Sequence, residues 1–195
     1  MRKNIIVGID LAGTAKNPTG WAVWKNRVVS ACQLYKNEEI LRRSFNCDPA
    51  LIAIDAPLSL PAKDIMRRAD REMYKRGYPV FPPRLPGMEK LTLRAMKISQ
   101  EIVGRGFDVI EVHPTSTRKA LNMPAKDWDR IQTLFLHLGL KGDLEVRALT
   151  PHEIDAITAA LTGYLYLQGK TELIGDEKEG YIVVPSNRDW RRLEL

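Results

Sequence analysis

Three strongly hydrophobic runs along the chain each end in an acidic residue. The acids are Asp10 after residues 5–9, Asp55 after residues 51–54, and Glu111 after residues 109–110. Apolar residues occupy both alternating sides of these runs, so we expect strands that are buried on both faces, as in a sheet between two layers of helices. In a parallel sheet the carboxyl ends of the strands share one edge, where open α/β sheets bind ligands. The pattern therefore predicts that the three acids converge.

The first third of the chain has the pattern of an antiparallel meander followed by a helix. Strands are expected near residues 4–10, 20–25 and 27–35. Asn26 suits the tight turn between the second and third of these strands. A short helix that contains Glu38 and Glu39 is expected next, before the strand that ends at Asp55.

Beyond Asp55, the hydrophobic spacing predicts mainly helices. They are expected from about residue 61 to 75, from 89 to 103, near 115–121 and at 127–139, with a terminal hairpin at 172–175 and 181–185. Residues 77–87 contain four prolines, which lack the amide donor that regular structure needs. This segment is expected to be a stiff loop, and a lid is one candidate role for it.

The best specified helix start lies at Thr150. Thr150 suits the N-cap, Pro151 the first helical position, and Glu153 the capping-box position. The helix that follows is apolar nearly all round, which indicates burial against the sheet. Asp155 is therefore an acid in a buried helix, where a cation, hydrogen-bond donors or the helix dipole must stabilise its charge.

Length and composition indicate one soluble globular domain over residues 1–195. Hydrophobic residues make up 44% and charged residues 28% of the chain, and no run approaches the roughly 18 apolar residues of a membrane span. The apolar stretch after Met1 ends at Ile9, which is short for a signal peptide. Cys32 and Cys47 suit two reduced thiols. These features predict a cytoplasmic protein without a membrane partner.

The chain carries a formal net charge of +6, most of which lies between residues 61 and 93, where eight basic and four acidic side chains occur. A surface that contacts phosphates and an ordinary solvated helix face explain this excess equally well. We take nucleic acid as the expected partner. The candidate phosphate contacts are Arg67, Arg68, Arg71, Lys75, Arg84, Arg118 and Lys119.

Five motifs occur together in this chain, at residues 8–14, 54–61, 80–88, 111–114 and 155–160. In this combination they resemble an uncharacterised family of predicted nucleases with a ribonuclease H-like fold, over about residues 4–168. The resemblance implies an α/β fold with a mixed central sheet. Its first three strands are antiparallel, parallel strands follow, and helices cover both faces.

The resemblance also implies a centre of two metal ions, Mg²⁺ or Mn²⁺. Asp10 would bridge both ions, Asp55 would bind one of them, and Asp155 would complete the shell. In two-metal hydrolysis one ion activates the attacking water and the other stabilises the leaving oxygen. Oxygen ligands of this kind are those that Mg²⁺ prefers.

The fourth acid and the two histidines leave alternatives open. Enzymes of the ribonuclease H type carry an acid on the first helix, where Glu38 and Glu39 are candidates, but Glu111 shares the strand-end position and is preferred. His113 is a candidate catalytic residue that could orient water or donate to a leaving phosphate, or it is a structural residue. His152 lies three residues before Asp155 and could reach the same edge.

These observations predict a metal-dependent nuclease that hydrolyses phosphodiester bonds of DNA or RNA. One alternative is an ATP-dependent phosphotransferase of the actin-like fold, since the loop after Asp10 contains a Gly-Thr pair. Such enzymes normally need two copies of the fold, and 195 residues leave room for one. The other alternative is a non-catalytic module that binds nucleic acid and uses its acids structurally.

Overall fold

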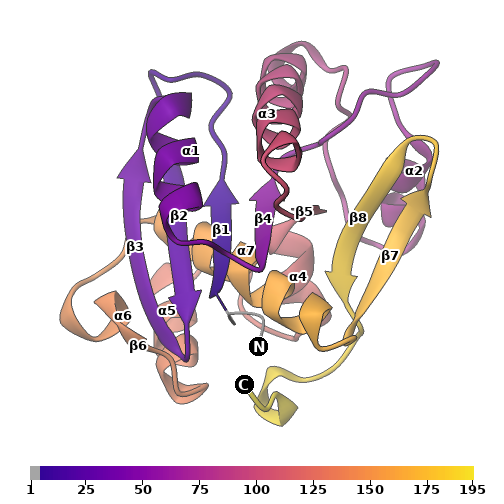
Figure 1. The fold of residues 1–195 in the computed structure, drawn as a ribbon. Helices are drawn as coiled ribbons and strands as arrows, with labels where there is room; N and C mark the ends of the chain where they lie inside the picture. The colour runs from indigo at the N-terminus through magenta and orange to yellow at the C-terminus, as the bar shows by residue number, and fades with distance from the viewer. Residues whose placement is uncertain (1–4) are drawn as a thin grey trace.

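The computed structural model of this protein describes residues 5–195, whose strands form one eight-stranded sheet (Figure 1). The strands are β1 (Ile5–Asp10), β2 (Thr19–Lys25), β3 (Val28–Leu34), β4 (Leu51–Asp55), β5 (Val109–Val112), β6 (Lys141–Gly142), β7 (Thr171–Asp176) and β8 (Gly180–Pro185). Their order across the sheet is β6-β3-β2-β1-β4-β5-β8-β7. β2 is antiparallel to β1 and β3, whereas β4, β5 and β8 continue parallel to β1. β7 closes the other edge antiparallel to β8.

Helices cover both faces of this sheet. They are α1 (Asn37–Asn46), α2 (Arg68–Lys75), α3 (Pro86–Gly104), α4 (Pro114–Ala120), α5 (Trp128–His137), α6 (Asp143–Val146) and α7 (Pro151–Leu167), with a 3-10 turn, η1 (Trp190–Arg192). α1 and α3 pack on one face, and α5 and α7 pack on the other (Figure 1). Successive side chains of β1 point to opposite faces of the sheet. Val7 and Ile9 therefore pack in the core under α1 and α3, and Ile6 packs in the core under α5 and α7.

The predicted fold class is confirmed. The antiparallel β3-β2-β1 unit followed by parallel β4 and β5, with helices on both faces, is the arrangement of the ribonuclease H-like fold. Within residues 5–195, no helix has the length and the apolar character that crossing a membrane requires.

One local prediction needs correction, and two short elements were not predicted. The helix expected from residue 61 begins at Arg68, because Asp64 has a positive φ of 59° and Arg67 is extended and buried. The short β6 and α6 were not predicted, since two-residue and four-residue elements leave no periodic pattern. The predicted terminal hairpin is confirmed as β7 and β8, which pair antiparallel, and β8 also pairs with β5 and so joins the main sheet.

Two glycines allow α7 to cross very close to β1 and β2. A Cβ on Gly8 would lie 2.0 Å from the carbonyl oxygen of Ala156, and a Cβ on Gly20 would lie 1.9 Å from that of His152. Neither distance can be accommodated without moving the backbone of α7. The absence of a side chain at these positions therefore brings the first turns of α7 next to the end of β1, where Asp10 lies.

We expect Gly20→Ala to destabilise the protein by about 1–3 kcal/mol, because the added methyl group overpacks the contact between β2 and α7. For a protein of this size, that corresponds to a decrease in Tm of roughly 2–4 °C per kcal/mol. Thermal unfolding monitored by circular dichroism measures the change. Gly104→Ala is the matched control, because its Cβ would meet nothing within 4 Å. Equal melting temperatures for the two variants would contradict the close approach of α7.

Candidate active site

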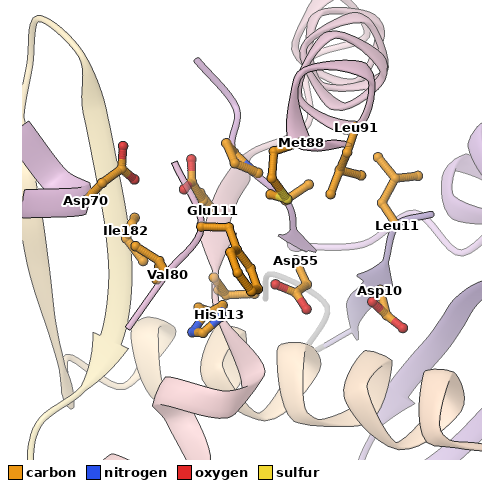
Figure 2. Close-up of a pocket in the computed structure, with 14 residues that line it drawn as sticks. Asp10, Leu11, Asp55, Asp70, Val80, Met88, Leu91, Glu111, His113 and Ile182 are labelled. Atoms are coloured by element: carbon orange, nitrogen blue, oxygen red, sulfur yellow. The ribbon is translucent and has the colours of Figure 1, made fainter. Parts of the chain in front are cut away.

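Asp10 and Asp55 end neighbouring parallel strands and are direct register partners. Their side chains lie beside one another at the floor of a cavity of about 190 Å³, below Met88 and Leu91 of α3 (Figure 2). The cavity is lined by Asp10, Leu11, Asp55, Ala56, Pro57, Asp70, Val80, Phe81, Met88, Leu91, Glu111, Val112, His113 and Ile182. The predicted convergence of acids at this edge is therefore present for Asp10 and Asp55.

The Asp55 carboxyl group is held in an environment that disfavours its charge. Burial raises the pKa of Asp55 well above its ordinary value, and the negative charges of Asp10 and Asp155 raise the pKa further. The positive charge of Arg118 opposes these effects without cancelling them. A carboxylate in such surroundings is stabilised by an added cation.

Asp155 projects from the second turn of α7 and forms an ion pair with Arg118 of α4. The Arg118 guanidinium also donates from Nε to the carbonyl oxygen of Ala125 at 3.0 Å and lies 5.3 Å from the ring centre of Trp128. Burial raises the pKa of Asp155, and Arg118 lowers it in part. Asp155 therefore lies where it contributes negative charge near Asp55, with one of its oxygens engaged by Arg118.

His152 is in direct contact with one of the cavity acids, Asp10. Its Nδ1 lies 2.7 Å from Oδ2 of Asp10. The hydrogen bond to Asp10 raises the pKa of His152 above its ordinary value, since it favours the protonated ring. The sequence signal for this contact was the spacing from Asp155, which is three residues away on the same helix.

Glu111 lines the same cavity, on the side toward Asp70, but both of its oxygens are occupied (Figure 2). Oε1 accepts from Nη2 of Arg67 at 2.6 Å, and Oε2 accepts from Nη1 at 2.7 Å and from the backbone amide of Leu58 at 2.8 Å. Burial raises the pKa of Glu111, and the contacts with Arg67 oppose that rise. As a metal ligand Glu111 would have to compete with a buried guanidinium.

The prediction that Arg67 contacts phosphate is corrected, because its side chain is 0% exposed. The guanidinium bridges Glu111 and Asp70, with Nη2 2.8 Å from Oδ1 of Asp70, and Nη1 also donates to Ser59 at 3.1 Å. Arg118 is buried as well, at 1% exposure, so it does not belong to an exposed phosphate-binding surface. A single sequence cannot separate such arginines from their exposed neighbours, since both kinds lie in the same basic segments.

The remaining basic candidates are exposed. They are Arg68, Arg71 and Lys75 of α2, Arg84 in the proline-rich loop, and Lys119 of α4. Several of them already have protein partners: Arg68 pairs with Glu72 at 2.7 Å, and Lys119 donates to the carbonyl oxygen of Gly77 at 2.6 Å. Their contact with nucleic acid stays a prediction.

His113 is a neutral, half-buried residue of the cavity wall. Its Nδ1 accepts a hydrogen bond from the backbone amide of Ser116 and so caps the start of α4. Burial, together with the nearby charge of Arg118, lowers the pKa of His113 to about 4. At neutral pH it therefore carries no charge, and its Nδ1 contact leaves Nε2 as the nitrogen that bears the proton.

The donor chemistry of the cavity fits Mg²⁺ or Mn²⁺. Hard cations prefer oxygen ligands, and Mg²⁺ is usually held by one or two carboxylates together with waters and substrate phosphates. Asp10 and Asp55 supply such a pair. Among residues 5–195, no three histidine, cysteine or acidic side chains are grouped closely enough to hold a metal ion by themselves. Glu38 and Glu39 do not line the cavity, and Glu39 lies 3.8 Å from Arg43.

Comparisons with known proteins identify one family and structural neighbours that include two RuvC structures. The chain of T. thermophilus RuvC in complex with a Holliday junction substrate is 17% identical, with a TM-score of 0.45, over 85% of this chain and 96% of that chain. A second Thermus thermophilus RuvC structure is 18% identical, with a TM-score of 0.38 and the same coverage. No curated protein matches the chain. The family described as "Protein of unknown function (DUF429)" matches residues 8–180, and this protein therefore belongs to the DUF429 family.

Proposed function

We propose that this protein is a metal-dependent nuclease that hydrolyses phosphodiester bonds of DNA or RNA. The observation that carries the proposal is the pair of register-matched carboxylates, Asp10 and Asp55, at the floor of a cavity, with Asp155 near enough to raise the pKa of Asp55. Raised pKa values of clustered acids in a cavity are typical of functional sites. A purely structural role would favour partners that lower these pKa values.

In this proposal Asp10 and Asp55 would hold Mg²⁺ or Mn²⁺. Asp155 would complete the coordination shell of the metal once its ion pair with Arg118 is broken. A bound divalent ion would supply a nucleophilic water and neutralise charge on the phosphate. Two ions, as the family resemblance implies, would require Asp155 as well as the Asp10–Asp55 pair. Glu111 remains the weaker fourth ligand, because Arg67 binds both of its oxygens.

The chain's own residues suggest further roles around these acids. His152 orients the Asp10 carboxylate through the 2.7 Å contact between Nδ1 and Oδ2. His113 is neutral, because its pKa is about 4, so it can donate a hydrogen bond from Nε2 to substrate oxygen without carrying charge. The exposed cations of α2, Arg84 and Lys119 position the phosphate backbone, which favours recognition of shape over sequence.

The test is cleavage of end-labelled single-stranded, duplex, hybrid and branched DNA and RNA in Mg²⁺, Mn²⁺ or EDTA. We expect cleavage that requires the metal and falls by about 100-fold or more in Asp10→Asn, since even outer-shell partners of metal sites contribute about 10–100-fold. Asp129→Asn, an exposed acid on α5, serves as the control with unchanged activity.

The same panel separates the competing functions. Binding of nucleic acid without cleavage under every metal condition would support a non-catalytic binding module. Metal-dependent binding of ATP without any binding of nucleic acid would support the phosphotransferase. Cleavage that persists in Asp10→Asn at the wild-type rate would remove Asp10 from the site and overturn the proposal.

A further inference from the structure

The side chain of Phe81 is exposed to solvent at the mouth of the cavity that contains Asp10 and Asp55. Its side chain is 69% exposed, more than Tyr74 at 50% or Tyr35 at 44%, the other exposed aromatic residues among residues 5–195. It nevertheless lines the same cavity as Asp10 and Asp55. A solvent-exposed phenyl ring adds little hydrophobic stabilisation to the fold. A ligand that covers the ring would gain that stabilisation on binding.

The backbone around Phe81 is fixed on both sides. Val80 before it is buried in a cluster with Met73 and Ile182, which anchors the loop to α2 and β8. After it, Pro82 accepts a hydrogen bond from the amide of Leu85 at 3.1 Å, and Pro83 accepts one from the hydroxyl of Thr92 at 3.3 Å. The prolines further restrict the φ angles of this loop. Binding of a ligand to the ring therefore loses little conformational entropy of the chain.

The lining of the cavity combines two kinds of chemistry. Asp10 and Asp55 are acidic and suit a hard cation and the phosphate that binds it. Phe81, Met88 and Leu91 are apolar, and Phe81 adds an exposed aromatic ring. A nucleotide combines the matching parts, because its phosphate is anionic and its base is a flat ring that stacks on aromatic side chains.

We propose that Phe81 stacks on an unpaired nucleobase of the substrate next to the phosphate held at the acids. Both faces of a base in a continuous duplex are covered by its neighbours, so only an unpaired or unstacked base can take this place. The substrate class is therefore nucleic acid with single-stranded or unpaired segments. This inference rests on the proposed function, because it assigns a substrate to that same cavity.

The experiment measures binding of a single-stranded oligonucleotide that contains 2-aminopurine, and of the same strand in a duplex, to the full chain. It is done in EDTA, where no metal-dependent cleavage occurs, and again in Mg²⁺, where the acids can hold the phosphate through the ion. We expect Phe81→Ala to weaken single-strand binding by about 5- to 100-fold, the range for loss of one stacked base. Duplex affinity should change less than about twofold. Phe81→Trp should retain both the affinity and the quenching of 2-aminopurine fluorescence that stacking produces.

Leu93→Ala is the matched control, because Leu93 is 52% exposed on α3 but does not line the cavity. Wild-type single-strand affinity in Phe81→Ala, or an equal loss for single strand and duplex, overturns the inference and leaves the nuclease proposal intact. No binding of any nucleic acid by the wild type, either in EDTA or in Mg²⁺, overturns both. Melting temperatures of all variants establish that each is folded.

Discussion

Asp55→Asn is expected to make the protein more stable while it abolishes metal-dependent cleavage. Burial and the charges of Asp10 and Asp155 raise the pKa of Asp55, so its ionised form destabilises the native state at neutral pH. The neutral amide removes that repulsion. We expect Tm in EDTA to rise by roughly 2–4 °C, which is about 1 kcal/mol for a protein of this size, and cleavage to fall by about 100-fold or more.

The effect of Asp55→Asn should depend on pH with a definite sign. An acid whose pKa is higher in the native than in the unfolded state binds its proton more tightly in the native state. The wild type therefore loses stability as the pH rises from the unfolded pKa, about 3.9, to the native pKa of Asp55. The difference in Tm between Asp55→Asn and the wild type should be small at pH 4, grow as the pH rises, and then level off.

Metal addition reverses the order of stability. A ligand that binds only the native state raises Tm, so Mg²⁺ or Mn²⁺ should stabilise the wild type and have little effect on Asp55→Asn. Differential scanning calorimetry from pH 4 to 8, with and without metal, measures both effects, and Asp129→Asn is again the control. A lower Tm for Asp55→Asn at every pH would identify Asp55 as a stabilising structural residue and contradict the proposed site.

Arg67→Met is expected to destabilise the protein by about 3–5 kcal/mol, the usual cost of leaving a buried ion pair without one partner. Arg67 is 0% exposed and holds together Glu111 of β5 and Asp70 of α2. Its Nη1 also donates to Ser59 in the loop after β4. Without the guanidinium, two buried carboxylates remain close to each other with no counter-charge. Equilibrium urea unfolding measures the loss.

Neutralising the acids in the Arg67→Met background should recover a large part of this loss. The triple variant Arg67→Met, Asp70→Asn, Glu111→Gln removes every charge of the network, and a neutral amide costs less to bury than an unpaired carboxylate. Arg68→Met is the matched control, because the Arg68 side chain is exposed and such pairs contribute about 0–1 kcal/mol. A loss below about 1 kcal/mol for Arg67→Met would show that water screens the network.

The order of elements in this fold could be predicted from periodicity because each long element buries a continuous apolar pattern. The runs that end at Asp10 and Asp55 pack under helices on both faces, and the capping box of Thr150 and Glu153 marks the start of α7. Short elements such as β6 could not be predicted. The two residues of β6 are structured only because they pair with β3, and each partner lies 113 positions away in the chain, as in the pairing of Val28 with Lys141.

The sequence alone predicted a sheet whose buried strands end at Asp10 and Asp55, because strands that are buried on both faces have continuous apolar runs, and its motifs resemble those of a ribonuclease H-like family. Only the tertiary structure decided what each charged group faces. It buried Arg67 and Arg118 and paired Glu111 with Arg67, whereas Arg68 is exposed. The close packing of α7 on Gly8 and Gly20 brought His152 to Asp10. The physical reason is that the pKa and the role of a charged group depend on its neighbours and its solvation. Segments that are distant in the sequence supply both.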